Sequence, residues 1–306
     1  MPEQNSANAP RAGAGGDHAT GAGRSTSRLI VALLTSATML AFAANSLLAR
    51  LAFRNTAIDP ASFTLVRIVS GAGVLALVLA HRRERVSSAR DALPSAFLLF
   101  VYAAAFSFAY RGISIGAGAL VLFACAQLVM IGFGYARGER THIFGLSLAV
   151  AGLAAFLLPG ASAPAPLPAG LMALAGTAWG GFSLLARASG TPVGNTASSF
   201  IWAVPLSLAL LLIEHGGIHL DPMGLLYAVV SGALASAVGY VVWYWVRVRM
   251  TAIAAGSVQL SVPVLSAVLG VALLGEQLTW QRWLAGGAVL LGVAITSMST
   301  SRRRDS

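Results

Sequence analysis

The fold of this chain is indicated most clearly by residues Ser236–Gly292, whose sequence is SAVGYVVWYWVRVRMTAIAAGSVQLSVPVLSAVLGVALLGEQLTWQRWLAGGAVLLG. This stretch predicts an apolar helix that ends in aromatic residues and arginines, then a short turn and a second apolar helix. Gln259 and Pro263 lie in the middle of the second helix, and a third helix follows the sequence Gly-Glu-Gln. A similar pattern occurs earlier, between Ala105 and Arg140. The repetition indicates a duplicated unit.

The composition excludes an ordinary soluble protein. Of the 306 residues, 57% are hydrophobic and 10% are charged, and the mean hydropathy is +0.77. In a typical soluble domain about a quarter of the residues are charged. The net charge is +10, and all 20 basic residues are arginines. A nucleic-acid-binding protein would gather them on one soluble face, but here they lie between hydrophobic runs. They indicate membrane topology, and we expect no nucleic-acid partner.

Ten apolar segments have about the length needed to cross the roughly 30 Å hydrocarbon core of a bilayer. In lipid each backbone polar group must be satisfied within its own segment, which favours helices. The ten-residue alternation of a membrane β-barrel is absent from the sequence. The expected spans are 29–49, 60–80, 93–110, 115–136, 142–158, 168–187, 196–213, 222–245, 252–274 and 280–298. The sequence therefore predicts an all-α integral membrane protein with ten transmembrane helices.

The arginines also predict the orientation of the chain, because cytoplasmic loops of membrane proteins are enriched in positive charge. With ten spans and a cytoplasmic N-terminus, fifteen arginines fall on the cytoplasmic side, four outside, and Arg67 within a span. Adding or removing one span would invert the later loops and spoil this asymmetry. We therefore expect both termini in the cytoplasm and a multi-pass protein in the cytoplasmic (inner) membrane.

The chain divides into two halves and two tails. Residues 1–28 are polar and predict a disordered cytoplasmic tail, and residues 299–306 form a second tail. The first apolar run is long for a signal peptide, so we interpret it as an uncleaved span. An uncharged, proline-rich link separates five spans in 29–158 from five in 168–298. Because each half has an odd number of spans, the two five-helix repeats are expected to be inverted relative to each other.

Several residues at corresponding places in the two halves resemble a known family. In the second half they are Tyr240, Trp243, Trp245, the small-residue run Ala252–Ser257, Pro263, Gly275–Glu276, Gly286 and Gly292; in the first half they are Arg67 after DPASFTLV, Gly138–Glu139 and Gly152. With these residues the chain resembles ten-span members of the drug/metabolite transporter superfamily that carry two EamA-type repeats. The resemblance implies a permease for a small molecule. The first half departs from the pattern, since Ala126 stands where the second half has Pro263.

A transporter needs polar groups near the middle of the membrane, where each one is costly. Gly256, Gln259 and Pro263 share one helix face by their spacing, and Ser236, Tyr240 and Trp243 share another. The candidate substrate-binding residues are Asn45, Arg67, Gln127, Trp179, Ser183, Trp202, Tyr240, Trp243, Gln259 and Pro263. The alternative is that small and polar residues hold helix pairs together, and that Tyr240, Trp280 and Trp283 belong to an interfacial aromatic belt.

Arg67 is the ionisable residue that lies clearly within a span, about 10 Å from the outer end of its helix at 1.5 Å per residue. Two interpretations remain open from the sequence. The guanidinium contacts a carboxylate or phosphate of the substrate, or it clamps carbonyl groups at helix ends. At this depth its long stem could also carry the charge part of the way out of the membrane.

No aspartate, glutamate or histidine lies in the middle of an expected span. Proton coupling through a buried carboxylate, as expected for a cationic-drug antiporter, therefore has no obvious carrier. Cys125 lies in an apolar run and predicts a core position, and the sequence offers no catalytic group, metal site or cofactor site. A neutral, zwitterionic or anionic metabolite is favoured as substrate.

These features together favour export of an amino acid or related small metabolite by alternating access, with Pro263 loosening the ninth span as a gate. The alternatives are a multidrug-type permease of the same fold, a membrane enzyme, and a membrane sensor or assembly partner. A sensor would predict a sizeable soluble domain, whereas the longest expected stretch outside the spans is the N-terminal tail. We expect the lipid bilayer and a small-molecule substrate as partners, and a monomer or a homodimer.

Overall fold

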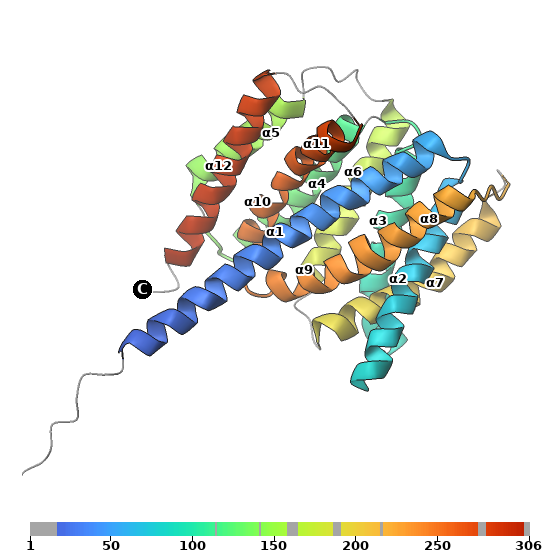
Figure 1. Cartoon of the computed structure of the whole chain (residues 1–306), viewed down its shortest axis with the longest axis horizontal. Helices are drawn as coiled ribbons and strands as arrows, with labels where there is room; N and C mark the ends of the chain where they lie inside the picture. Colours follow the sequence, from blue (N-terminus) through green and yellow to red (C-terminus); the bar gives the residue numbers. More distant parts are fainter. Residues whose placement is uncertain are drawn as a thin grey trace, which may run out of the picture.

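The computed structural model describes residues 17–113, 115–140, 142–157, 165–185, 191–214, 217–274 and 280–302. Across these ranges the protein is helical and contains no strand. The elements are α1 (Asp17–Asn55), α2 (Pro60–Arg82), α3 (Ala89–Ala109), α4 (Ile115–Ala136), α5 (Ile143–Leu157), α6 (Pro166–Leu185), α7 (Pro192–Ile213), α8 (Pro222–Val230), the π-helix η1 (Ser231–Val238), α9 (Gly239–Arg247), α10 (Ala252–Gln259), α11 (Ser261–Leu274) and α12 (Trp280–Arg302). Figure 1 shows a bundle with α1 crossing its face and α5 and α12 together at one side.

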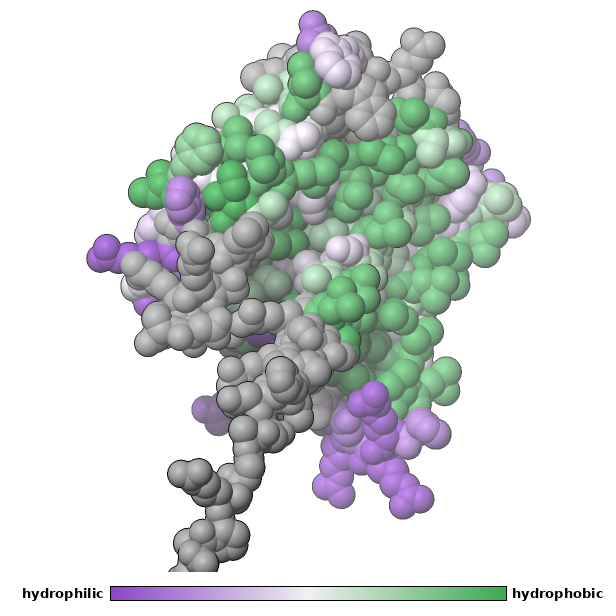
Figure 2. Space-filling view, turned by 60° about the vertical axis from the view of Figure 1, so that its left-hand side comes forward, coloured by the Kyte–Doolittle hydropathy of each residue, from purple (hydrophilic) through white to green (hydrophobic). Residues whose placement is uncertain are grey.

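Six helical segments of the described chain are long and apolar enough to cross a membrane: Leu29–Asn55, Pro60–Arg82, Ala89–Ala109, Pro192–Ile213, Pro222–Arg247 and Ala252–Leu273. The fifth segment joins α8, η1 and α9, and the sixth joins α10 and α11. Shorter apolar helices lie within α4, α5 and α12. Figure 2 shows that hydrophobic residues cover the middle of the face it presents, with hydrophilic residues near its margins. The prediction of an all-α membrane protein is confirmed.

The first helix differs from the expected boundary. α1 begins at Asp17, so residues 17–28, which were predicted to be part of a disordered tail, are helical. Extending a helix that already exists avoids the cost of nucleating a new one. The remaining residues of the expected tail, 1–16, lie outside the described residues.

Five helices begin at a capping residue that the local sequence specifies. The side chains of Asp59, Thr191, Asp221, Thr251 and Ser88 each accept a hydrogen bond from a backbone N–H in the first turn of the following helix. Proline follows the first three, which suits the first helical position because its missing N–H would have no partner there. Such caps contribute about 1 kcal/mol each. Thr191 and Pro192 also explain why α7 begins four positions before the expected span at 196.

The helices pack in a pattern that treats the two halves alike. α1 packs against α11, α9 and η1 of the second half, and α6 packs against α3 and α4 of the first. α2 packs on α7, α5 on α12 and α4 on α10. If each helical segment of the first half is exchanged with the segment of the same order in the second half, the same set of helix contacts results.

Glycines allow the closest helix contacts, where a side chain would meet backbone. A Cβ atom at Gly232 of η1 would lie 2.1 Å from the carbonyl oxygen of Arg67 in α2. One at Gly176 of α6 would lie 2.1 Å from the carbonyl oxygen of Leu122 in α4. Between α5 and α12, Cβ atoms at Gly152 and Gly292 would lie 2.9 and 2.5 Å from backbone nitrogens of the other helix. Close approach of this kind is how small residues stabilise helix pairs within a membrane.

We predict that Gly232→Ala destabilises the protein while Gly73→Ala does not. A methyl group at Gly232 must push η1 away from α2, whereas one at Gly73 meets no atom within 4 Å. Overpacking of this kind costs about 1–3 kcal/mol, which lowers the melting temperature by roughly 2–10 °C. Thermal unfolding of the two purified variants in one detergent measures the difference. Equal melting temperatures would contradict the contact between η1 and α2.

Candidate functional site

The centre of the bundle contains a buried arginine that joins three helical segments. Arg67 of α2 is fully buried, and its Nε donates to Ser236 Oγ at 3.1 Å. Its Nη2 donates to Tyr240 Oη at 2.9 Å and to Tyr102 Oη at 3.3 Å. Nη1 is buried and has no hydrogen-bond partner. The hydrogen-bond partners of this guanidinium are hydroxyl groups, and not the carbonyl groups at helix ends that were one expectation from the sequence.

The π-helix η1 places two serines toward this centre. Ser231 donates to Asn45 Oδ1 at 2.5 Å, and Ser236 accepts from Arg67. These serines are five residues apart, which is the spacing that a π-helix brings round to the same side. Asn45 in turn donates from Nδ2 to Tyr102 Oη at 3.5 Å. Short π segments often occur at functional sites. Here the segment bonds to α1 and α2, and Asn45 and Arg67 of those helices bond in turn to Tyr102 of α3.

An aromatic cluster adjoins the arginine through Tyr102 and Tyr240. It consists of Phe42, Tyr102, Trp179, Phe182, Tyr240 and Trp243. Phe42 meets three of the other rings edge-on, with centroid separations of 5.1 Å to Trp179 and 5.8 Å to both Tyr240 and Trp243. Tyr102 lies 5.1 Å from Trp179. Trp243 Nε1 donates to Ser183 Oγ at 3.1 Å, so the indole N–H is satisfied inside the bundle. The cluster combines apolar walls with a few directed polar groups.

A pair of glutamines extends the polar centre toward α4 and α10. Trp179 Nε1 donates to Gln259 Oε1 at 2.5 Å, and Gln259 Nε2 donates to Met130 Sδ at 3.1 Å. Gln127 donates from Nε2 to the carbonyl oxygen of Gly256. These contacts hold α4, α6 and α10 together, and they bring Gln127 and Gln259 to the same helix junction.

The ninth apolar segment is interrupted one residue after Gln259. α10 ends at Gln259 and α11 begins at Ser261, with Leu260 between them. Pro263 has no N–H and so cannot donate to the carbonyl of Gln259 four residues earlier. The proline therefore explains the interruption, which lies beside the glutamine that binds Trp179.

The space left in the centre is small. A cavity of about 20 Å³ is lined by Phe42, Asn45, Ser46, Tyr102, Phe106, Tyr110, Ala119, Leu122, Phe123 and Trp179. Such a volume holds about one water molecule. This cavity is therefore too small to hold a metabolite in the present arrangement.

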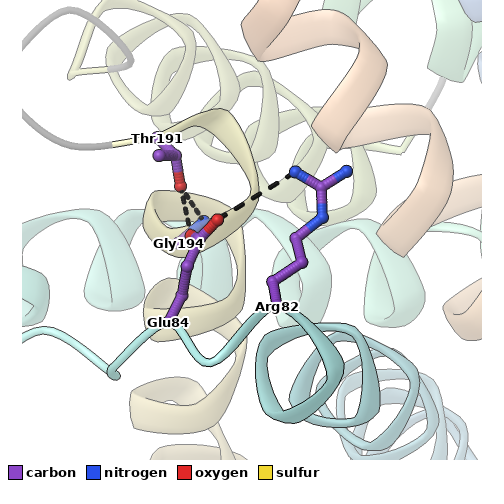
Figure 3. Close-up of polar contacts among 4 residues, drawn as sticks. All are labelled: Arg82, Glu84, Thr191 and Gly194. Carbon is purple, nitrogen blue, oxygen red and sulfur yellow. Dashed lines mark hydrogen bonds and ion pairs between the residues drawn. The ribbon is translucent and has the colours of Figure 1, made fainter.

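Hydrogen bonds join the two halves at the end of the bundle that contains the α2–α3 loop, here called the Glu84 face. Figure 3 shows Thr191 Oγ1 donating to Glu84 and accepting from the backbone N–H of Gly194, with Arg82 on the other side of Glu84. Arg82 Nη1 lies 4.0 Å from Glu84 Oε1, and Thr191 Oγ1 lies 2.5 Å from Glu84 Oε2. These contacts tie the α2–α3 loop to the start of α7.

Three further contacts hold the Glu84 face closed. Ser95 and Ser199 hydroxyl groups lie 2.8 Å apart, joining α3 to α7. Trp202 Nε1 donates to the carbonyl oxygen of Ser87 at 3.1 Å. The backbone N–H of Ile253, in the first turn of α10, donates to Glu139 Oε2 at 3.0 Å.

The opposite end, here called the Asp59 face, carries a similar contact. Asp59 Oδ2 accepts from the backbone N–H of His219 at 2.9 Å, and the backbone N–H of Asp59 donates to the His219 carbonyl at 3.2 Å. Burial acts to raise the pKa of the Asp59 carboxyl. The hydrogen bonds from Ser62, His219 and Ala61 outweigh burial and lower this pKa below its ordinary value. The α7–α8 loop is thus bound to the start of α2.

Comparison with known proteins places the fold in a family. The model of the EamA-like transporter family matches residues 167–298. The uncharacterized protein PA1977 of Pseudomonas aeruginosa is 50% identical over 266 residues, which cover 86% of this chain and 93% of that protein. The chain belongs to the EamA-like transporter family. It is therefore a multi-pass membrane transporter of the drug/metabolite type, with the bilayer and a small-molecule substrate as partners.

A solved crystal structure of another protein shares the fold. It is 19% identical, with a TM-score of 0.72 over 90% of this chain and 99% of the other. At that identity the likeness concerns the fold alone.

Most candidate residues of this EamA-family protein meet in one place. Asn45, Arg67, Trp179, Ser183, Tyr240, Trp243 and Gln259 are all buried and are linked by the hydrogen bonds and ring contacts described above. Gln127 and Pro263 flank this group at the α4–α10 junction. Trp202 lies apart, at the Glu84 face. Tyr240 is 1% exposed and so is not a belt residue, whereas Trp280 is 73% exposed, as a belt residue would be.

Other positions that the sequence analysis named lie outside the described residues. Gly275 and Glu276, which carry part of the family resemblance, are outside the described residues, as is most of the link between the halves. Among the residues that are described, no group of three histidine, cysteine or acidic residues is arranged to hold a metal ion.

The sequence did not single out Tyr102, Phe42 or Ser231. Tyr102 is a polar aromatic residue in the interior of the third expected span, and the criterion that selected Trp179 would have selected it too. Phe42 carries no polar signal, and Ser231 is one serine among many. Their roles depend on how each helix is rotated in the bundle.

We predict that Asp59→Asn reduces the acid sensitivity of the fold. Because the folded-state pKa of Asp59 is lowered, its ionised form contributes stability above the ordinary pKa near 3.8, and this contribution is lost as the pH falls through the folded-state value. The asparagine variant keeps the cap but has no proton to take up. Melting temperatures between pH 3 and pH 7 should therefore fall less steeply on acidification in the variant. Superimposable profiles would rule out a contribution from Asp59.

Proposed function

We propose that this protein is a secondary transporter that exports a small metabolite, such as an amino acid or a related compound, across the cytoplasmic membrane by alternating access. The observation that carries the proposal is the closed polar centre that both halves build. Arg67 and Tyr102 come from the first half, Ser236 and Tyr240 from the second, and their hydrogen bonds join the halves. A site at the interface of two repeats is where alternating-access carriers bind their substrates.

The proposed topology is ten spans in two inverted five-helix repeats, 29–158 and 168–298, with both termini cytoplasmic. The exchangeable helix pairing supports the repeat. The contacts at the two faces support the arrangement of the spans, since the α2–α3 loop meets the start of α7 while the α7–α8 loop meets the start of α2. The distribution of arginines supports a cytoplasmic Glu84 face.

In the proposed cycle this structure represents the occluded state, in which the central site is open to neither side of the membrane. The cavity of about 20 Å³ is too small for a metabolite, and hydrogen bonds between the halves close both faces. Opening toward the cytoplasm requires the Glu84-face contacts to separate. The interruption between α10 and α11 supplies a place where the ninth span bends, beside Gln259.

A multidrug-type permease and an enzyme are weaker candidates. No carboxylate lies among the polar groups that surround Arg67 in the described part of the chain, so a cationic drug has no charged partner there. The family to which the chain belongs is one of transporters, and we propose no enzymatic activity.

We predict that Gln259→Leu impairs transport. Leucine leaves the buried indole N–H of Trp179 without an acceptor, which costs about 1–3 kcal/mol. If this cost falls on the substrate-carrying state, flux falls by about fivefold or more. The measurement is uptake into proteoliposomes across a panel of amino acids and other metabolites. Thr177→Val is the matched control, because Thr177 is exposed on the same helix as Trp179 and bonds only within its own turn. Normal flux of every substrate in a folded Gln259→Leu protein would refute the proposed site.

A disulfide across the Glu84 face should arrest the cycle. Ser95 and Ser199 present hydroxyl oxygens 2.8 Å apart, so cysteines at both positions place sulfurs near bonding distance. In a Cys125→Ser background, oxidation of Ser95→Cys/Ser199→Cys should abolish flux, and reduction should restore it. Each single cysteine variant serves as control. Unaltered flux through the cross-linked protein would exclude separation of the halves at this face.

A further inference from the structure

We propose that Arg67 recognises a carboxylate of the transported metabolite, so that the substrate is a small monocarboxylate, with or without an amino group, whose body packs against the aromatic cluster. This inference rests on the proposed transport function and specifies the substrate of the same site.

The first support is an uncompensated charge. The acidic residues of the described chain stand at helix ends or in loops, and no described carboxylate lies within 4.0 Å of the Arg67 guanidinium. Its partners are the hydroxyl groups of Ser236, Tyr102 and Tyr240, which are neutral. Arginine stays protonated in proteins, so the positive charge is permanent. The centre therefore attracts an anion and repels a cation.

The second support is an unused donor. The guanidinium carries five N–H bonds in a planar fork that matches the two oxygens of a carboxylate. Nε and Nη2 are occupied, but Nη1 is fully buried without a partner. A buried donor left unsatisfied is unfavourable. A carboxylate that binds Nη1 and Nη2 together would satisfy it and form a bidentate pair, the strongest arrangement for this side chain.

The third support is the way Tyr102 separates the guanidinium from the cavity. The Arg67 Cζ lies 5.2 Å from the centroid of the Tyr102 ring and 5.4 Å from that of Phe106, and both rings line the cavity. The Tyr102 hydroxyl is held by two long hydrogen bonds, 3.3 Å from Arg67 and 3.5 Å from Asn45. The Tyr240 hydroxyl is held at 2.9 Å. A carboxylate arriving from the cavity therefore displaces Tyr102 and leaves Tyr240 in place.

The charge of the site favours a carboxylate over a phosphate ester. One guanidinium neutralises one negative charge, whereas a phosphate ester carries about 1.5 to 2 at neutral pH. The excess would remain buried among apolar rings. An amino group next to the carboxylate is compatible with the site, because the rings of Trp179 and Tyr240 can face an ammonium through cation–π contact.

The test compares ligands that differ only in the charged group. Probes are the standard amino acids, the straight-chain monocarboxylates from acetate to hexanoate, and the amides and amines of the same carbon skeletons. Each is scored as a competitor of flux in proteoliposomes and by thermal stabilisation of the detergent-purified protein. We expect at least one carboxylate to bind about tenfold more tightly than its amide and amine. Arg67→Lys should retain part of this preference and Arg67→Gln should lose it.

A second variant keeps the test decisive if Arg67→Gln does not fold. Tyr102→Phe removes the hydroxyl that competes for Nη2, so carboxylate affinity should rise by about two- to tenfold. Tyr244→Phe is the control, because its hydroxyl binds the carbonyl oxygen of Phe182 and not Arg67. A purely structural Arg67 predicts no gain in either variant.

The outcomes separate the two proposals. If the protein moves only amines, amides or other uncharged or cationic compounds, or if amides bind as well as carboxylates, the carboxylate inference is wrong and the transport function stands. If Tyr102→Phe leaves carboxylate affinity unchanged or weaker, the inference is also wrong. If a folded protein moves no compound of the broad metabolite panel, the transport function itself fails.

Discussion

The guanidinium of Arg67 is the constraint on which the centre of this bundle depends. A charged side chain in the middle of a membrane protein costs about 2.5–3.5 kcal/mol on the insertion scale, so its donors must find acceptors from several helices at once. Ser236 and Tyr240 come from one helical segment and Tyr102 from another. Moving any of these helices by the width of an atom would leave buried donors unpaired. The arginine therefore fixes how α2, α3 and the α8–α9 segment sit together, and with them the two halves of the chain.

The glycine contacts complete this arrangement at the level of the backbone. Gly232 lets η1 lie directly on the carbonyl of Arg67, which brings Ser236 within reach of Nε. The π-helical turn then presents Ser231 to Asn45 on the same side. The close backbone contact at Gly232 and the hydrogen bond from Arg67 to Ser236 thus belong to the same interface between α2 and η1. Moving the two helices apart would break both.

Hydropathy and arginine placement in the sequence were enough to predict an all-α membrane protein, and the spacing of Ser236, Tyr240 and Trp243 was enough to place them on one buried face. The residues that the sequence did not single out share a physical reason. Tyr102 and Phe42 face the centre only because of the rotation of α3 and α1, which neighbouring helices decide. Trp202 was expected near the middle, yet its helix turns it toward Ser87. The stretch SGALASAV gives no sign of a π-helix, because its geometry comes from packing against α2 and α1.

The fixed charge at Arg67 has a consequence for energetics. No described carboxylate lies beside it, so under the proposed mechanism a bound carboxylate would be the net charge that crosses the membrane. A monoanion that crosses from a negatively charged cell interior moves down the membrane potential, which contributes about 2.3 kcal/mol per 100 mV. This corresponds to roughly a fortyfold outward bias in concentration. Membrane voltage would then drive a monoanion outward with no coupling ion, whereas a zwitterion on the same site would respond only to its own gradient.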